Sequence, residues 1–212
     1  MLVSIHSSGQ SLLQLINDLL DFSRLESGKT PVDAVDFDLH SELAEITAML
    51  LQQARGKQLY LTSNVDPAVP YYLRGDKQLL RQVLVNLTAN AIKFTEEGGV
   101  EVKVVNLNPS AATPRLRFEV RDTGIGIPEA AQEKIFESFT QADDSTNRRF
   151  GGTGLGLAIS KQLITLMGGE IGVESIDGQG GTFWFELTLP LQEDTEAREA
   201  EDSLPGSARI IL

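Results

Sequence analysis

The sequence of 212 residues contains no cysteine, and this absence excludes a disulfide framework, a thiolate zinc site and a cysteine nucleophile. The two histidines, His6 and His40, lie too far apart in the sequence to suggest a histidine-rich metal site. No apolar run approaches the roughly 20 residues that span a membrane, and the N-terminus lacks a signal-peptide pattern. Basic residues number 18 against 30 acidic ones, and the formal net charge of −12 argues against nucleic acid as a partner.

Hydrophobic residues make up 41 % of the chain, which is enough for a folded core. In the first region, which ends near Gly28, apolar residues recur at helical intervals and form a wide stripe. This region predicts one helix without a partner inside its own segment, and packing in a helix bundle or dimer is favoured over packing on the following domain. The stripe consists of Leu12, Leu13, Leu15, Ile16, Leu19, Leu20 and Phe22.

The second region, residues 36–191, mixes helical and strand patterns and predicts an α/β (α+β) domain. Residues 141–152 are polar and without periodicity, which predicts a mobile loop. Helices are expected over 39–55, 76–94, 128–135 and 153–167, and strands over 58–65, 100–104, 116–120, 170–175 and 182–189.

One expected helix carries a pair of asparagines. Asn86 and Asn90 are four residues apart, so they share a helix face, and Lys93 follows one turn later. An amide oxygen is a hard, neutral ligand, and Mg²⁺ also borrows phosphate oxygens. These three residues could therefore hold a hydrated Mg²⁺ and phosphate, although an asparagine pair satisfied locally is the more frequent case for such a pattern alone.

Two glycine-rich stretches follow. Asp122-Thr-Gly124-Ile-Gly126-Ile-Pro128 comes directly after a strand, where a carboxylate can accept a hydrogen bond from an exocyclic amine. Gly151-Gly-Thr-Gly-Leu-Gly-Leu157 opens a helix, and such a helix start favours an anion. The second stretch fits neither a Walker loop nor a Rossmann fingerprint. Arg148 and Arg149 precede it and could reach a terminal phosphate.

In this order, the motifs resemble the N, G1, F, G2 and terminal Gly-Thr boxes of the ATP-binding domain of sensor histidine kinases, within the GHKL superfamily. Phe136-Glu-Ser-Phe139 matches the F box, and residues 139–157 look like the form found in hybrid histidine kinases. The resemblance implies the Bergerat-type fold, a two-layer sandwich of a mixed sheet and three helices, preceded by one long helix. It also implies an ATP lid over residues 138–153.

The resemblance assigns roles around one ATP molecule with Mg²⁺ as cofactors. Asn90 would coordinate Mg²⁺, Asn86 would support the phosphates or the water shell of the metal, and Lys93 would contact phosphate. Arg148 or Arg149 would approach the γ-phosphate. The pocket would further contain Asp122 against the adenine amine, Phe94, Gly124, Gly126, Gly152, Thr153, Gly154, Leu155, Gly156, and Thr182 near the adenine.

The position four residues before the expected metal ligand distinguishes the ATPases of the superfamily from its kinases. GHKL ATPases place a glutamate four residues before the magnesium asparagine, as the base that activates water. Here that position holds Asn86, which cannot take a proton. The resemblance therefore favours a histidine kinase, which transfers the γ-phosphoryl group to a positioned imidazole. A GHKL-type ATPase and a non-catalytic nucleotide-binding or dimerisation module are the alternatives.

The phosphoacceptor box of the family is missing, because His6 precedes Ser-Ser and His40 precedes Ser-Glu. We therefore expect a piece of a longer hybrid kinase, with part of the second dimerisation helix (1–28), the catalytic domain (36–191), an acidic linker (192–206) and the start of a receiver domain (207–212). The implied partners are ATP or ADP, the missing phosphoacceptor helix and receiver domain, a cognate response regulator or phosphotransfer protein, and a second copy in a homodimer. The implied location is cytoplasmic, with the parent protein either free or anchored in the inner membrane.

Overall fold

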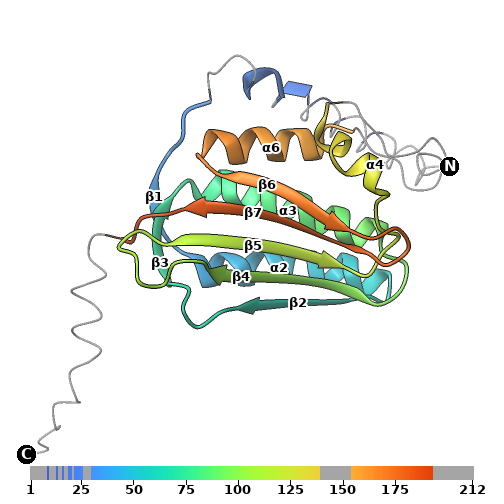
Figure 1. Cartoon of the computed structure of the whole chain (residues 1–212), viewed down its shortest axis with the longest axis horizontal. Coiled ribbons are helices and arrows are strands. Elements are labelled where there is room, and N and C mark those ends of the chain that lie inside the picture. Colours follow the sequence, from blue (N-terminus) through green and yellow to red (C-terminus); the bar gives the residue numbers. More distant parts are fainter. Residues whose placement is uncertain are drawn as a thin grey trace, which may run out of the picture.

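The computed structural model describes residues 30–138 and 154–192, together with positions 9, 13, 16, 19, 20 and 22–25, which are helical. Its main sheet has the order β2-β4-β5-β7-β6, with β2 parallel to β4 and the other pairs antiparallel (Figure 1). The predicted mixed sheet is therefore confirmed. The strands are β2 (Tyr60–Val65), β4 (Gly99–Asn106), β5 (Arg115–Asp122), β6 (Glu170–Ser175) and β7 (Gly181–Thr188).

Within the described residues, three helices pack on one face of this sheet and confirm the predicted two-layer sandwich (Figure 1). These helices are α2 (Leu39–Gly56), α3 (Lys77–Phe94) and α6 (Gly156–Leu166). The expected helix over 128–135 is a short α4 (Glu129–Gln132) followed by a 3-10 turn, η1 (Lys134–Phe136), and α4 contacts β6.

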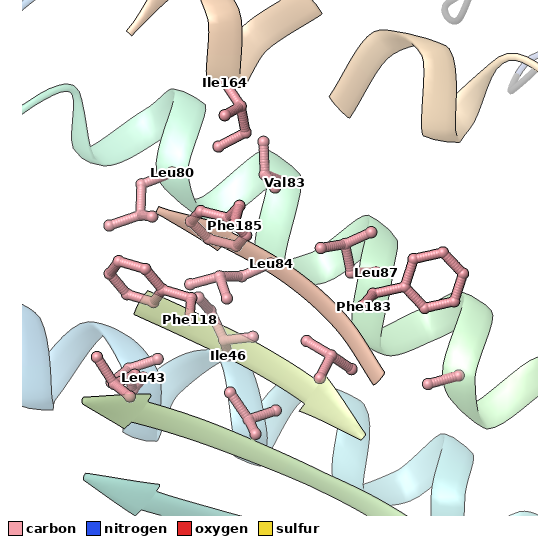
Figure 2. Packing of buried hydrophobic residues seen from close by; sticks show 14 of the residues in the cluster. Leu43, Ile46, Leu80, Val83, Leu84, Leu87, Phe118, Ile164, Phe183 and Phe185 are labelled. Carbon is pink, nitrogen blue, oxygen red and sulfur yellow. The ribbon is translucent and has the colours of Figure 1, made fainter. Parts of the chain in front are cut away.

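The core lies between the sheet and the helices. Phe118 of β5 and Phe185 of β7 stack with ring centroids 4.6 Å apart, and both side chains are fully buried. Figure 2 shows these rings among aliphatic side chains of the helices, such as Leu84 of α3 and Ile46 of α2. Burying each such side chain stabilises the fold by about 1.5–3 kcal/mol relative to its exposure.

Both long central helices begin at an aspartate. Asp38 accepts a hydrogen bond from Ser41 N at 3.0 Å, and Asp76 accepts from Gln78 N and Leu79 N at 3.1 and 2.9 Å. These side chains satisfy amide groups that have no partner within the helix, which stabilises each helix by about 1 kcal/mol. The caps explain why α2 and α3 begin where the sequence predicted, within one residue.

Two features of the fold differ from the sequence prediction. Two short strands, β1 (Val35–Asp38) and β3 (Tyr72–Gly75), form a separate antiparallel pair that was not predicted. Four residues are too few for strand alternation to show in a sequence, and this pairing joins positions about 40 residues apart. In addition, α6 begins at Gly156 instead of residue 153, because Gly154 has a φ of +69°, which no α-helix accepts.

Part of the prediction falls outside the described residues. This holds for residues 139–153 of the expected lid, for the acidic run after residue 192 and for the expected receiver strand at 207–212. The division of the chain into four segments stays a prediction. Among the helices that the structure describes, none has the length and apolar character needed to cross a membrane.

Candidate functional site

The two asparagines of α3 are joined side chain to side chain. Asn90 Nδ2 donates to Asn86 Oδ1 at 3.3 Å, which confirms that the pair shares one helix face. Asn86 Nδ2 in turn donates to Ser160 Oγ of α6 at 2.8 Å, and Ser160 is buried. Because the Nδ2 amino group of Asn90 is bonded to Asn86, the Oδ1 oxygen of Asn90 is the atom left to bind a cation.

The N-terminus of α6 rests directly on Asn86. A Cβ atom at Gly156 would lie 2.6 Å from Asn86 Oδ1, closer than real contacts allow, so a larger residue would have to displace the Asn86 side chain. Leu155 occupies the N-cap position and its apolar side chain caps none of the first amide groups of α6. Such amide groups and the positive end of the helix dipole favour an anion.

Asp122 ends β5 and is buried. Its Oδ1 atom accepts a hydrogen bond from Gly124 N at 2.8 Å, and the backbone of Gly181 also donates to the carboxylate. Burial raises the pKa of this carboxyl above its ordinary value, and the two hydrogen bonds oppose the rise only in part. A buried carboxylate with few donors can accept a further hydrogen bond from a ligand amine.

The turn after Asp122 packs against the end of α3. Ile125 N donates to Phe94 O at 3.4 Å, and a Cβ atom at Gly124 would lie 2.5 Å from the same oxygen. Gly126 has a φ of +69°, and a Cβ there would lie 2.0 Å from Ile176 O in the β6–β7 turn. Both glycines are therefore required by close backbone approach, Gly124 where the acidic turn meets the asparagine helix and Gly126 where it meets the β6–β7 turn.

Lys93 lies on the last turn of α3, half buried, with its Nζ atom 4.8 Å from the ring centroid of Phe94. Burial lowers the pKa of Lys93, and the nearby ammonium group of Lys57 lowers it further. An anion bound beside Lys93 would favour its charged form and so oppose both the burial and the repulsion from Lys57.

Thr182 follows Gly181 on β7, and its expected place near the adenine stays a prediction. Pairing in β7 sets Gly181 opposite Asp122, and Thr182 opposite Arg121. Because successive residues of a strand point to opposite faces, Thr182 lies on the face away from the helices. A sequence motif alone could not show this, since a shift of one residue in register exchanges the two faces.

Four other predicted residues, Arg148, Arg149, Gly152 and Thr153, lie outside the described residues. Ser160 was missed by the sequence analysis. The available signal was its position four residues after Gly156, which places both residues on the same face of α6.

The chemistry of the donors fits a magnesium ion that arrives with a nucleotide. No group of three or more histidine or acidic side chains that could hold a metal occurs within residues 30–138 and 154–192 or at the few described positions before them. An amide oxygen of Asn90 together with phosphate oxygens and waters is a donor set that Mg²⁺ accepts. The described donors thus fit a metal–nucleotide complex.

A separate cavity of about 600 Å³ lies on another side of α6. Leu25, Phe136 and Lys161 are among the residues that line it, and neither Asp122 nor Asn90 does. Phe22 and Leu25 also pack against the core. This cavity therefore belongs to the contact between the N-terminal segment and the sandwich, and it is distinct from the asparagine site.

Fold and site together define a nucleotide-binding domain in which a glycine-opened helix start and an acidic turn with a buried carboxylate both pack against α3, the helix that carries the amide pair. Residues 75–193, more than half of the chain, match the family described as histidine kinase-, DNA gyrase B- and HSP90-like ATPase, and the chain belongs to this family.

Three relatives define the similarity more closely. Over 188 residues, 89 % of this chain, the sequence is 51 % identical to the sensor histidine kinase AruS of Pseudomonas aeruginosa PAO1. The crystal structure of full-length ShkA in complex with AMPPNP has a TM-score of 0.79 at 35 % identity, covering 90 % of this chain and 38 % of that chain. The catalytic domain of the histidine kinase ThkA has a TM-score of 0.61 at 28 % identity, covering 74 % and 95 %. The chain spans about a fifth of the length of AruS, since the match covers 19 % of that protein.

Proposed function

We propose that this chain is the ATP-binding catalytic part of a hybrid two-component sensor histidine kinase. The observation that carries the proposal is the state of Asn86. A carboxamide stands where an ATPase needs a carboxylate, and it is bound on both sides by Ser160 and Asn90. The position can therefore orient a metal ligand but cannot remove a proton from water. Membership in the family and the AMPPNP complex of ShkA support ATP as the nucleotide.

In this proposal the described residues bind and orient ATP. Asp122 accepts a hydrogen bond from the adenine amine, the backbone amides at Gly154–Gly156 bind phosphate, and Lys93 contacts phosphate. Asn90 supplies one oxygen to Mg²⁺, which neutralises phosphate charge when bound. Arg148 and Arg149 remain candidates for the γ-phosphate.

The transfer step needs no base from this chain. The bond between the γ-phosphorus and the bridging oxygen of the β-phosphate breaks, a bond forms between that phosphorus and a histidine nitrogen, and ADP leaves. Positioning and charge neutralisation are the contributions that the ATP-binding domain can make to such a step. The accepting histidine belongs to a phosphoacceptor helix outside this sequence.

The exposed apolar side chains of the N-terminal segment favour another helix as its partner. Leu13, Ile16, Leu19 and Leu20 are helical positions whose side chains are about half exposed, between 47 and 63 %. A stripe of this kind is typical of a helix that packs on other helices. The proposed occupants are the phosphoacceptor helix and a second copy of the chain. A receiver domain and a response regulator or phosphotransfer protein complete the proposed set of partners.

The proposal is tested with ATP labelled at the γ-phosphate. The chain alone is expected to bind Mg²⁺–AMPPNP, to take up no acid-labile label and to show no steady-state hydrolysis. Label should appear on an added protein that carries the phosphoacceptor helix pair of the same kinase. Sustained release of inorganic phosphate by the chain alone would favour the ATPase alternative, and failure to bind any nucleotide would leave only a docking module.

A further inference from the structure

The C-terminal end of α3 is closed by a lysine from another part of the chain. Lys57 Nζ donates to the backbone oxygens of Ile92 at 2.9 Å, of Lys93 at 2.6 Å and of Thr95 at 3.1 Å. An ammonium group has three N–H donors, so its capacity matches these three carbonyl groups. The helix that carries the asparagine pair thus ends against a cation supplied by the turn between α2 and β2.

The remaining carbonyl groups of this turn also have donors. Ala91 O accepts from Thr95 N at 3.1 Å and from Thr95 Oγ1 at 2.7 Å, and Phe94 O accepts from Ile125 N at 3.4 Å. The last carbonyls of a helix have no partner within the helix. At the end of α3, the Phe94 carbonyl accepts from the turn after Asp122, and three neighbouring carbonyl groups accept from Lys57.

The backbone of Lys57 is itself held in place. Lys57 is the C-cap of α2, and the next residue, Gln58, has a φ of +60°. Leu59 N donates to Ala54 O and Gln58 N to Arg55 O, both at 3.0 Å, which is the Schellman pattern of a helix end. Leu59 is buried. The ammonium group is therefore projected from a fixed turn toward the end of α3.

The positive charge of Lys57 also favours an anion beside Lys93. The C-terminal end of a helix carries about half a negative charge, which opposes the binding of an anion beside Lys93. An ammonium group on these carbonyls offsets that negative charge. Lys57 is also close enough to influence Lys93 electrostatically, as the lowered pKa of Lys93 indicates.

We propose that Lys57 is a positioning residue of the nucleotide site, which holds the last turn of α3 so that Lys93 faces the phosphates of the bound nucleotide. This inference rests on the proposed function, because it assumes that Lys93 contacts phosphate. Lys57 itself does not touch the nucleotide, and its effect passes through the α3 turn.

The test compares three variants by calorimetry with Mg²⁺–AMPPNP and with adenosine, and by hydrogen exchange. Lys57→Met is expected to weaken AMPPNP binding about tenfold, since it removes hydrogen bonds to a charged group. It should change adenosine binding little and accelerate exchange of the amides of residues 93–95. Lys57→Arg should restore most of the affinity. Lys103→Met removes the same charge from a half-exposed position that faces Glu119, on β4 and away from Lys93, and should behave like the unmodified chain.

Thermal unfolding of each variant checks that it is folded, and Lys57→Gln, which keeps two N–H donors, replaces Lys57→Met if that variant unfolds. Faster exchange with unchanged AMPPNP affinity would reduce Lys57 to a helix cap and overturn the proposal. Equal losses for AMPPNP and adenosine, or no rescue by arginine, would also overturn it. If the unmodified chain binds no nucleotide, the proposed function fails, and exchange at residues 93–95 still decides whether Lys57 holds the turn.

Discussion

Asn86 of α3 and Ser160 of α6 are joined by a hydrogen bond of 2.8 Å from Nδ2 to Oγ, in a place where Ser160 is almost completely buried. The bond fixes the orientation of the Asn86 carboxamide, and Asn86 Oδ1 then accepts from Asn90. Ser160 of α6 and the proposed metal ligand are therefore parts of one chain of hydrogen bonds.

Ser160→Ala should lower the free energy of unfolding by about 1 kcal/mol, because the half-buried Asn86 amide loses its acceptor. Affinity for Mg²⁺–AMPPNP should fall as well, since Asn90 loses its oriented neighbour. Urea denaturation and calorimetry measure the two effects. Thr165→Ala is the matched control, because the Thr165 hydroxyl bonds to Lys161 O of its own helix at an exposed site. If Ser160→Ala is destabilised but binds Mg²⁺–AMPPNP with unchanged affinity, Ser160 has no role in the nucleotide site.

Gly156→Ala should destabilise the chain by about 1–3 kcal/mol, because the added methyl group must displace Asn86 or α6. Alanine is otherwise the better helix former, so the sign of the effect reports the contact and not helix propensity. Gly56→Ala is the control, since a Cβ at Gly56 meets nothing within 4 Å. The two variants are compared by thermal unfolding, and equal melting temperatures would argue against the close approach of α6 to Asn86.

Asp122→Asn should reduce the affinity for both ATP analogues and ADP about ten- to a hundredfold, because a charged acceptor for the adenine amine is lost. The same change should raise stability at neutral pH. Burial raises the pKa of the carboxyl in the folded chain. Stability is therefore lost as the pH rises from the ordinary pKa of 3.8 through the folded-state pKa, and this loss persists at higher pH.

Below the ordinary pKa both states of the chain hold the proton, so the stability of the unmodified chain should approach that of the Asp122→Asn variant. Unfolding by urea at several pH values measures this difference. A variant that is less stable than the unmodified chain at pH 7, or that binds ADP with unchanged affinity, would refute the role assigned to Asp122.

Asn90→Ala should lower the affinity for AMPPNP about tenfold in the presence of Mg²⁺ and much less in its absence, because an oxygen ligand of the ion is removed. Calorimetric titrations with and without Mg²⁺ separate these cases. Asn64→Ala on the exposed part of β2 removes the same amide away from the site and serves as control. An equal loss with and without the metal would assign Asn90 to the nucleotide and not to Mg²⁺.

Local patterns in the sequence determined most elements of the fold. The periodicity before Phe94 and the aspartate at position 76 were enough to predict α3, and strand alternation predicted β4, β5 and the β6–β7 hairpin. Each of these signals depends on residues that are close in sequence, where side-chain spacing maps directly onto one face. The order of the glycine and asparagine motifs likewise indicated a nucleotide site before any geometry was known.

Tertiary structure alone decided the contacts between distant segments. The β1–β3 pair, the Gly181 position opposite Asp122, the bond from Asn86 to Ser160 and the closure of α3 by Lys57 each join residues at least 30 positions apart. No periodicity records such a pairing, because register and helix packing are set by the whole core and not by neighbouring residues. The sequence thus determined which chemical groups the site contains, and the packing of α3 against α6 and β5 decided which atoms they present to a ligand.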